Sequence, residues 1–260
     1  MLKTFRADLH IHSCLSPCGE EEMRPRALVN QAVAKGLDMI AICDHNSAEN
    51  TAAFISAGDE KGLKVLPGIE VTSKEEIHLI ALFDTQEDCT ALQNLIYQNL
   101  PGDNVEEVFG PQTVVNEKDE TIGVNRRMLI GATLLPFEQI VSVIHSLRGV
   151  AIASHIDRQA FSLLGQLGFI PEGMPLDGLE ISSRTSKEEA KNRFRSYQHY
   201  SFVWFSDAHR LEDIGRSMTH FLLKETTSRE VKMALHHEEG RRVMEAWSPT
   251  GSPAIGGAPG

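Results

Sequence analysis

The sequence predicts an α/β protein whose strands form a parallel barrel. Short apolar runs that are typical of buried strands recur along the chain, and segments with apolar residues at helical spacing separate most of them. The chain has 260 residues and is 41% hydrophobic, so it can bury one large core. Because α/β barrels of this length commonly form one domain, we expect a single barrel.

The expected elements follow one another in βα order. Strands are expected at residues 4–10, 38–43, 64–69, 77–83, 149–154, 177–182 and 202–206. The first helix should begin after Pro25, carry its apolar residues at helical spacing and end at Gly36. Further helices are expected at 48–61, 88–100, 136–147 and 186–199, the last with a capping box formed by Ser186 and Glu189.

Residues 103–135 break this pattern and predict an insertion at the barrel mouth. Two short β-like runs, 112–116 and 120–124, flank a Glu-Lys-Asp turn, which indicates a small hairpin. Arg126 and Arg127 follow it. They would be substrate-specificity residues if the hairpin were a lid, and solvated residues if it were an ordinary turn.

The C-terminal part predicts a cap and a tail. A last strand is expected at 218–223, and a helix at 228–246 with Val231, Leu235 and Val243 facing inward. We therefore expect a barrel over residues 1–225 and a capping helix over 226–247. Residues 248–260 are rich in Gly and Pro, which predicts a flexible tail.

Metal-binding side chains end several of the apolar runs. In a barrel, strand ends that are distant in sequence become neighbours, so such residues can build one polynuclear metal site. The segments are Asp8-Leu9-His10-Ile11-His12, Cys43-Asp44-His45-Asn46, Gly68-Ile69-Glu70, Ser154-His155 and Ser206-Asp207-Ala208-His209.

These residue types suit divalent zinc, manganese or iron, which prefer imidazole and carboxylate ligands. His10 and His12 are two residues apart, so on a strand both rings point to one face, together with Asp8. Alone, that spacing is equally consistent with a strand that has a wet polar face. Asp207 and His209 repeat the spacing near the other end of the chain, which favours a metal site.

As a set, these motifs resemble those of the PHP superfamily, the polymerase and histidinol phosphatase group of metal-dependent phosphoesterases. The motifs D-L-H-x-H-S, D-H-N, G-I-E, S-H-x-x-R and S-D-A-H occur here in the family's order. The resemblance covers about residues 5–225. It implies a distorted (β/α)7 TIM-like barrel with two or three metal ions (zinc, manganese or iron) at its C-terminal mouth.

The resemblance also implies a ligand set. One metal would be held by His10, His12, Glu70 and Asp207, a second by Glu70, His78 and His155 with Glu70 as the bridge, and a third by His45 and His209.

The third site departs from the family pattern. Many relatives have a further His or Asp seven or eight positions after the opening motif, where this chain has Pro17 or Cys18. Cys18 could be a thiolate ligand or an ordinary loop thiol. Alternatively, one of the acidic residues 20–22, or a water molecule, could complete the site.

The implied activity is hydrolysis of a phosphate ester of a small molecule, of the nucleotide or sugar phosphate type, by a hydroxide that bridges two metals. Arg158, three residues after His155, would share the charge on the phosphate unless it instead pairs with Asp157 or Glu180. Arg184 and Arg210 are weaker candidates for the same role.

Two further roles are expected around the reacting atoms. His209, His45 or a metal-bound water would protonate the leaving oxygen. Asp44 would orient metal ligands. The other histidines are expected to be structural or solvated, without partners: His145, His199, His220, His236 and His237.

Composition bears on the alternatives. The net charge of −11 argues against binding of long nucleic acid, and only 6% of residues are aromatic. A nuclease acting on short oligonucleotides or DNA ends, or a non-catalytic metal-binding regulatory module, remains as an alternative. The chain shows no leader, no apolar run of membrane-spanning length and no paired cysteine spacing, so we expect a cytoplasmic protein.

Overall fold

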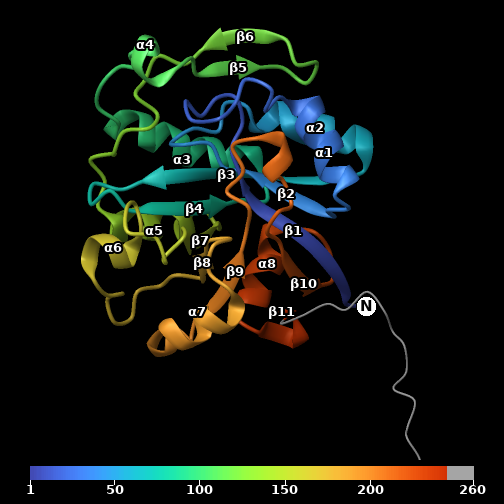
Figure 1. Cartoon of the computed structure of the whole chain (residues 1–260), viewed down its shortest axis with the longest axis vertical. Coiled ribbons are helices and arrows are strands. Elements are labelled where there is room, and N and C mark those ends of the chain that lie inside the picture. The colour runs from blue at the N-terminus through green and yellow to red at the C-terminus, as the bar shows by residue number, and fades with distance from the viewer. Residues whose placement is uncertain (245–260) are drawn as a thin grey trace, which may run out of the picture.

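Nine strands of the computed structural model, which describes residues 1–244, form one sheet that curls into a nearly closed barrel (Figure 1). The strand order is β11-β10-β1-β2-β3-β4-β7-β8-β9. A parallel bridge between Ile11 and Ala208, just beyond β9, brings that end of the sheet back to β1. The strands are β1 Lys3–Ile11, β2 Met39–Ile42, β3 Lys64–Thr72, β4 His78–Leu82, β7 Val150–Ala153, β8 Gly178–Ile181, β9 Ser201–Trp204, β10 Thr219–Leu223 and β11 Arg242–Val243.

Each of the seven predicted strand ranges overlaps a strand, but the predicted all-parallel order is wrong at β4. The sets β1-β2-β3 and β7-β8-β9 are parallel, whereas β4 runs antiparallel to both β3 and β7. The cause is the short link between Thr72 and His78, which cannot hold the helix that a parallel crossover needs. The start of β4 therefore lies beside the end of β3.

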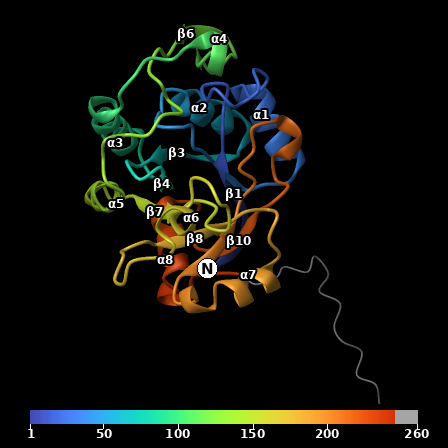
Figure 2. The same ribbon diagram turned by 60° about the vertical axis from the view of Figure 1, so that its left-hand side comes forward.

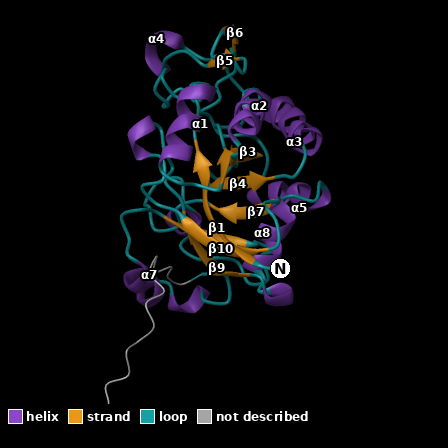
Figure 3. Cartoon of the chain, turned by 90° about the vertical axis from the view of Figure 1, so that its right-hand side faces the viewer, coloured by secondary structure: helices purple, strands orange, loops and turns teal. Residues whose placement is uncertain are grey.

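Helices cover the outside of the sheet (Figures 2 and 3). Apolar residues of α1 and α2 pack with one outer cluster, which includes Leu28 and Phe54, and those of α3 and α5 pack with another, which includes Leu92 and Ile140. The helices are α1 Pro25–Ala34, α2 Thr51–Lys61, α3 Gln86–Asn99, α4 Glu106–Phe109, α5 Phe137–Ser146, α6 Leu163–Leu167, α7 Lys187–Arg193 and α8 Ser228–Leu235.

A separate apolar cluster fills the barrel interior at the end away from the metal-binding motifs. Leu9, Ile152 and Phe221 from three different strands belong to it. Val231 and Leu235 of α8 belong to the same cluster, so α8 packs against the interior. The barrel is thus apolar at its base and polar at its mouth, so the mouth is free for chemistry.

Two helices end earlier than the sequence predicted. The N–H of Glu189 donates to Ser186, as the capping box requires, but α7 ends at Arg193. The last helix ends at Leu235, not at residue 246, because His237 and Glu239 adopt positive φ. The chain then reverses, and Val243 lies in β11, paired with β10, instead of on a helix face. The predicted flexible tail, 248–260, lies outside the described residues.

The predicted hairpin is present as β5 Thr113–Val115 and β6 Thr121–Val124. It lies at the edge of the molecule beside α4 (Figure 1). The N–H of Thr113 donates to the carbonyl of Cys14, and Arg24 donates to the carbonyl of Asp119. The hairpin is thus attached to the loop that follows β1.

Two histidines that we expected to lack partners share one buried carboxylate. Asp177 accepts hydrogen bonds from His145 at 2.9 Å, His236 at 2.8 Å and the N–H of Ala151 at 2.8 Å. Lys232 lies 3.2 Å from it. Burial alone would raise the pKa of Asp177, but these partners lower it to about 2. This cluster joins α5 and α8 to the base of β8.

Asp177→Asn should lower the free energy of unfolding by about 2 to 3 kcal/mol at pH 7, because Lys232 and the hydrogen-bond donors around residue 177 lose a buried negative charge. The folded-state pKa lies below the unfolded value, so this contribution is present above pH 4 and is lost as the pH falls toward 2. Urea unfolding measured between pH 2 and 7 checks both points. Asp213→Asn, which removes an exposed pair with Arg216, is the control and should change stability by less than about 1 kcal/mol. An equal loss in both variants would contradict this prediction.

Candidate metal centre

One buried carboxylate lies at the centre of the barrel mouth. Glu70, near the end of β3, is 1% exposed, and five imidazole nitrogens lie 3.1 to 3.4 Å from its oxygens. Those nitrogens belong to His10, His12, His45, His78 and His155.

The topology explains how these residues meet. His10 and His12 come from the end of β1, while His45 and His155 follow β2 and β7. His78 is the first residue of β4 and pairs with Thr72. It reaches the mouth only because β4 is reversed.

The segment after β9 adds Asp207 and His209. The Asp207 Oδ1 atom lies 3.4 Å from His10 Nε2 and 3.2 Å from His12 Nε2. His209 Nδ1–H donates to the carbonyl of Asp207, and its ring stacks on His12 with 4.1 Å between centroids. His209 is the most exposed histidine of the group, with 27% of its side chain accessible.

Three overlapping triads of this group have donor atoms close enough to share an ion. They are His10, His12 and Glu70; His45, Glu70 and His78; and His12, His45 and His209. Glu70 belongs to two triads, as a bridging ligand would. The triads contain six of the predicted ligands but leave out Asp207, His155 and Cys18, so the ligand set stays a prediction.

Unsatisfied polar atoms test whether metals fit here. Among the described residues, His45 Nδ1, Glu70 Oε1, His78 Nδ1 and His155 Nδ1 are buried without a hydrogen-bond partner. Leaving such atoms unpaired costs about 1 to 3 kcal/mol each. Imidazole nitrogens and a carboxylate oxygen are the donors that zinc, manganese and iron accept, so the residues fit divalent cations.

The charges of these buried groups depend strongly on one another. Burial would raise the pKa of Glu70 and of Asp207, but the surrounding histidines hold both well below their ordinary values. Against burial, Glu180 and Glu70 raise the pKa of His10 well above its ordinary value, and hydrogen bonds to Asp207 and Glu70 raise that of His12 to about 9. Protons on the imidazoles thus balance the charge of the carboxylates. Bound divalent cations would balance the same charge.

Two histidines of the cluster are instead held neutral. Burial lowers the pKa of His78 to about 4, although Glu70 opposes the shift. Burial and the nearby His12 lower the pKa of His209 to about 3. Both rings are therefore ready to act as neutral ligands or hydrogen-bond partners.

Buried groups behind the ligands fix their orientation. Glu180 on β8 accepts from His10 Nδ1 at 3.0 Å and from the N–H of His155 at 2.9 Å. Ser16 accepts from His12 Nδ1 at 3.0 Å and donates to Asp44 at 2.7 Å. Such partners present the opposite ring nitrogen to a metal.

Sequence reasoning missed Glu180 and Ser16 as functional residues. Glu180 was considered only as a partner for Arg158, although it lies at a strand end as the ligands do. Asp44, predicted to orient ligands, is buried behind the cluster, where it also accepts from the N–H and hydroxyl of Ser13. Its link to His12 runs through Ser16.

Arg158 pairs with a partner that the sequence did not predict. Its Nη2 lies 2.7 Å from Asp207 Oδ2, not against Asp157 or Glu180. Asp157 is instead occupied by Ser182 and Thr185, which donate to it. The guanidinium therefore lies at the edge of the metal cluster.

Other predicted site residues lie outside the cluster. Arg210 pairs with Glu20 at 3.1 Å on the surface. Arg126 is exposed at the base of the hairpin, and Arg127 stacks over the ring of Tyr97 at 4.1 Å. Of the candidate arginines, only Arg158 and Arg184 line the cavity beside the cluster.

The loop that contains Cys18, where the chain departs from the family pattern, lies next to His45. Burial would lower the pKa of His45, but the charge of Cys18 and a hydrogen bond to it raise that pKa to about 9. Glu20 is held by Arg210, and Glu21 pairs with Arg24. Of the alternatives for the third site, Cys18 therefore contacts the predicted ligand His45, while the N–H of Glu20 donates to the carbonyl of His209.

Asp8 has a different role from its neighbours on β1. It accepts the N–H groups of Ser206 and Gly215, both at 2.9 Å, and so holds the segment that contains Asp207 and His209. Burial raises the pKa of Asp8 to about 6. Its carboxylate does not belong to any of the triads.

Backbone strain occurs in this region, as it does elsewhere in the described residues. Asn46, His155 and Asp207 have φ of 53°, 28° and 51°. Positive φ is uncommon outside glycine, and strained residues cluster at functional sites. The strain at His155 and Asp207 turns both side chains toward the cluster at the point where their strands end.

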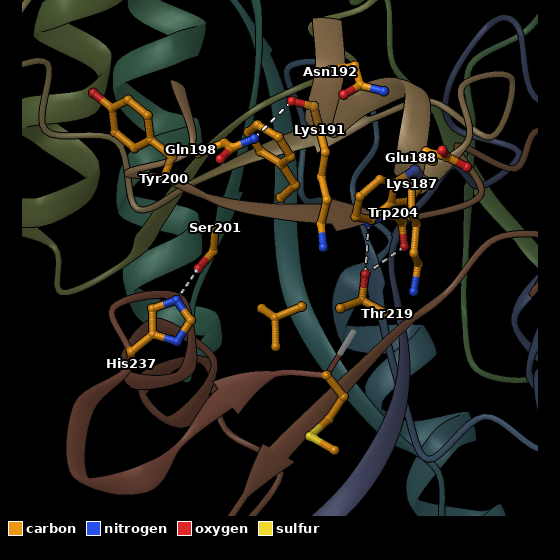
Figure 4. Close-up of a pocket in the computed structure, with 13 residues that line it drawn as sticks. Lys187, Glu188, Lys191, Asn192, Gln198, Tyr200, Ser201, Trp204, Thr219 and His237 are labelled. Carbon is orange, nitrogen blue, oxygen red and sulfur yellow. Dashed lines mark hydrogen bonds between the residues drawn. The ribbon is translucent and has the colours of Figure 1, made fainter. Parts of the chain in front are cut away.

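Two cavities differ in their relation to the cluster. One of about 530 Å³ is lined by His78, His155, Arg158 and Phe161, among others. A larger one, of about 750 Å³, lies between α7 and β9–β11, where Ser201 bonds to His237 (Figure 4). None of its lining residues belongs to the metal cluster.

Comparison with known proteins agrees with the site. A family model described as the PHP domain matches residues 8–169, more than half of the chain. This match confirms the family resemblance that the motifs predicted. A 5'-3' exoribonuclease from Haemophilus influenzae is 34% identical over 94 residues, which span 34% of this chain and 33% of that protein.

Similar solved structures support the fold. The lesion-specific endonuclease PfuEndoQ from Pyrococcus furiosus matches 93% of this chain and 58% of its own, with a TM-score of 0.70 and 17% identity. A metal-dependent phosphoesterase from Bifidobacterium adolescentis matches 78% of this chain and 87% of its own, with a TM-score of 0.54 and 19% identity. This chain therefore covers only part of the nucleases that it matches. No helix within residues 1–244 is long and apolar enough to cross a bilayer.

Metal binding at pH 7 should release protons, because His10, His12 and His45 must lose theirs to become ligands. Their raised pKa values mean that affinity should increase as the pH rises toward 9 and weaken as it falls. Titration calorimetry with Mn²⁺ or Zn²⁺ in buffers of different ionisation enthalpy should detect release of more than one proton per chain.

Two variants separate proton release on metal binding from the loss of one metal ligand. His12→Ala should reduce the number of protons released, whereas His209→Ala should weaken binding without changing that number, since His209 is already neutral. A metal affinity that stays constant between pH 6.5 and 8.5 would contradict the prediction that these histidines lose protons on binding.

Proposed function

This chain belongs to the PHP family of metal-dependent phosphoesterases, and we propose that it hydrolyses a phosphate ester of a small molecule, of nucleotide or sugar phosphate type. The observation that carries the proposal is the cavity of about 530 Å³ beside the cluster, with His78 and His155 in its wall and Arg158 at its edge. That volume suits a ligand of nucleotide size.

The metals in this proposal are two or three divalent ions of zinc, manganese or iron. His10, His12, Glu70 and Asp207 would hold one, and Glu70, His78 and His155 a second. His45 and His209, with Cys18, would hold a third. When bound, such ions supply Lewis-acid charge and lower the pKa of water.

Arg158 would bind the phosphate. Its guanidinium lies on Asp207 and is 36% exposed, so it can reach a phosphate oxygen without leaving the edge of the cluster. A permanently charged planar fork suits the oxygens on which charge accumulates during the reaction. Arg184, which also lines this cavity, would contact the rest of the substrate.

His209 would move the proton. Its Nδ1–H is fixed by the carbonyl of Asp207, so Nε2 would serve either the third metal or the transferred proton, and not both at once. It is more exposed than the other histidines of the cluster, so a leaving oxygen could approach it. Ser16 and Asp44 hold His12, and Glu180 holds His10, in the orientation that the reaction needs.

A nuclease is the second candidate function. The local identity with a 5'-3' exoribonuclease favours it, and so does the fold shared with a lesion-specific endonuclease. The same cluster would serve a phosphodiester, because the charge to be stabilised is the same. A net charge of −11 favours a strand end or a short oligonucleotide over a long duplex.

His10→Ala should abolish phosphate release while leaving the fold intact, because it removes a cluster residue that bridges Glu70 and Asp207. Arg158→Ala should raise KM and lower kcat, with a combined loss of about 100-fold or more in kcat/KM. Phosphate release from mononucleotides, bisphosphates, sugar phosphates and short oligonucleotides, with metal content and circular dichroism of each variant, checks both.

The same screen distinguishes the two candidates. Arg210→Ala, at an exposed pair away from the cavity, is the matched control and should keep full activity. Turnover of oligonucleotides with strong salt dependence would favour the nuclease. Full activity of His10→Ala would exclude the proposed centre.

A further inference from the structure

Phe161 has a costly backbone conformation at the edge of the cavity. It lies between β7 and α6 with φ of 57°, which is an outlier for a bulky residue. Its side chain is also poorly protected, since the residue is 42% exposed. Neither the strain nor the exposed apolar ring stabilises the fold, so another reason for this placement is needed.

The neighbours of Phe161 fix its ring beside the metal cluster. The carbonyl of Phe161 accepts the N–H of His78 at 2.9 Å. Its ring stacks on the His78 imidazole, with 4.8 Å between centroids and 23° between planes. One face of the ring is therefore covered by a predicted metal ligand, while the residue lines the 530 Å³ cavity.

The cavity thus has a charged inner wall and an aromatic edge. Arg158 and His155 line it together with Phe161, and Arg184 belongs to the same wall. If Arg158 holds the phosphate, the group attached to the other side of the sugar would lie near the Phe161 ring. An aromatic base stacks well on such a ring, and the stacking tolerates any base.

We propose that Phe161 is a stacking platform for a nucleobase, so the substrate class is a nucleotide, free or at a strand end, and not a sugar phosphate. This inference rests on the proposed function, which supplies the position of the phosphate. Phe161 would then be a specificity residue. It would contact the base, while the cluster carries out the phosphoryl chemistry.

The test compares two esters that differ only by the base. The metal-loaded chain should prefer adenosine 5'-monophosphate to ribose 5-phosphate by about tenfold or more, both in kcat/KM and in affinity by calorimetry. In Phe161→Leu that preference should fall by about tenfold. Phe161→Tyr, which keeps the ring, should retain it.

Controls keep the outcomes separate. Phe169→Leu removes a phenylalanine that is 57% exposed outside the cavity, and it should change neither ratio. Metal content is measured for each variant because Phe161 touches His78. A short 5'-phosphorylated oligonucleotide, added as a third substrate, distinguishes a terminal nucleotide from a free one.

A wild-type protein without preference for the nucleotide, or a Phe161→Leu variant with undiminished preference, would overturn the inference. If the wild-type chain hydrolyses none of the three substrates, the proposed function fails, whereas the affinity ratio between the two monophosphates still decides the role of Phe161.

Discussion

The structure of the barrel mouth depends on the contact between one buried carboxylate and the imidazoles around it. Glu70 is 1% exposed and has nitrogens of five histidines within 3.4 Å. A charge so far from water is costly unless it is compensated, and several of the surrounding nitrogens have no hydrogen-bond partner. Protons compensate the charge in the metal-free chain. Divalent cations would compensate the same charge, and the side chains already lie close to the positions that ligands of such ions need.

The fold supplies this arrangement through the reversal of β4 between two parallel sets of strands. With β4 reversed, His78 begins a strand at the same mouth where the other ligands end theirs. The apolar interior and α8 close the opposite end. Asp8, Ser16 and Glu180 then hold the loops and rings in place, so rigid strands and buried hydrogen bonds position the cluster.

Most of the fold and the cluster residues could be predicted from the sequence, because apolar strand runs and the order of the motifs are local signals. The reversal of β4 was missed because the pattern of an inner strand is the same in both directions. The end of α8 was missed because His237 at positive φ leaves no periodic signal. Glu180 and Ser16 were missed because their roles come from tertiary contacts: Glu180 meets His10 across 170 positions of sequence. The partner of Arg158 is also set by tertiary contact with Asp207.

The most direct test is a crystal structure of the chain grown with Mn²⁺ or Zn²⁺, with anomalous diffraction recorded at the edge of the added metal. Anomalous peaks should lie against Glu70, with one between His10, His12 and Asp207 and another beside His78 and His155. A fully metal-loaded crystal in which these side chains converge but no peak lies among them, or in which they are dispersed, would contradict the central claim.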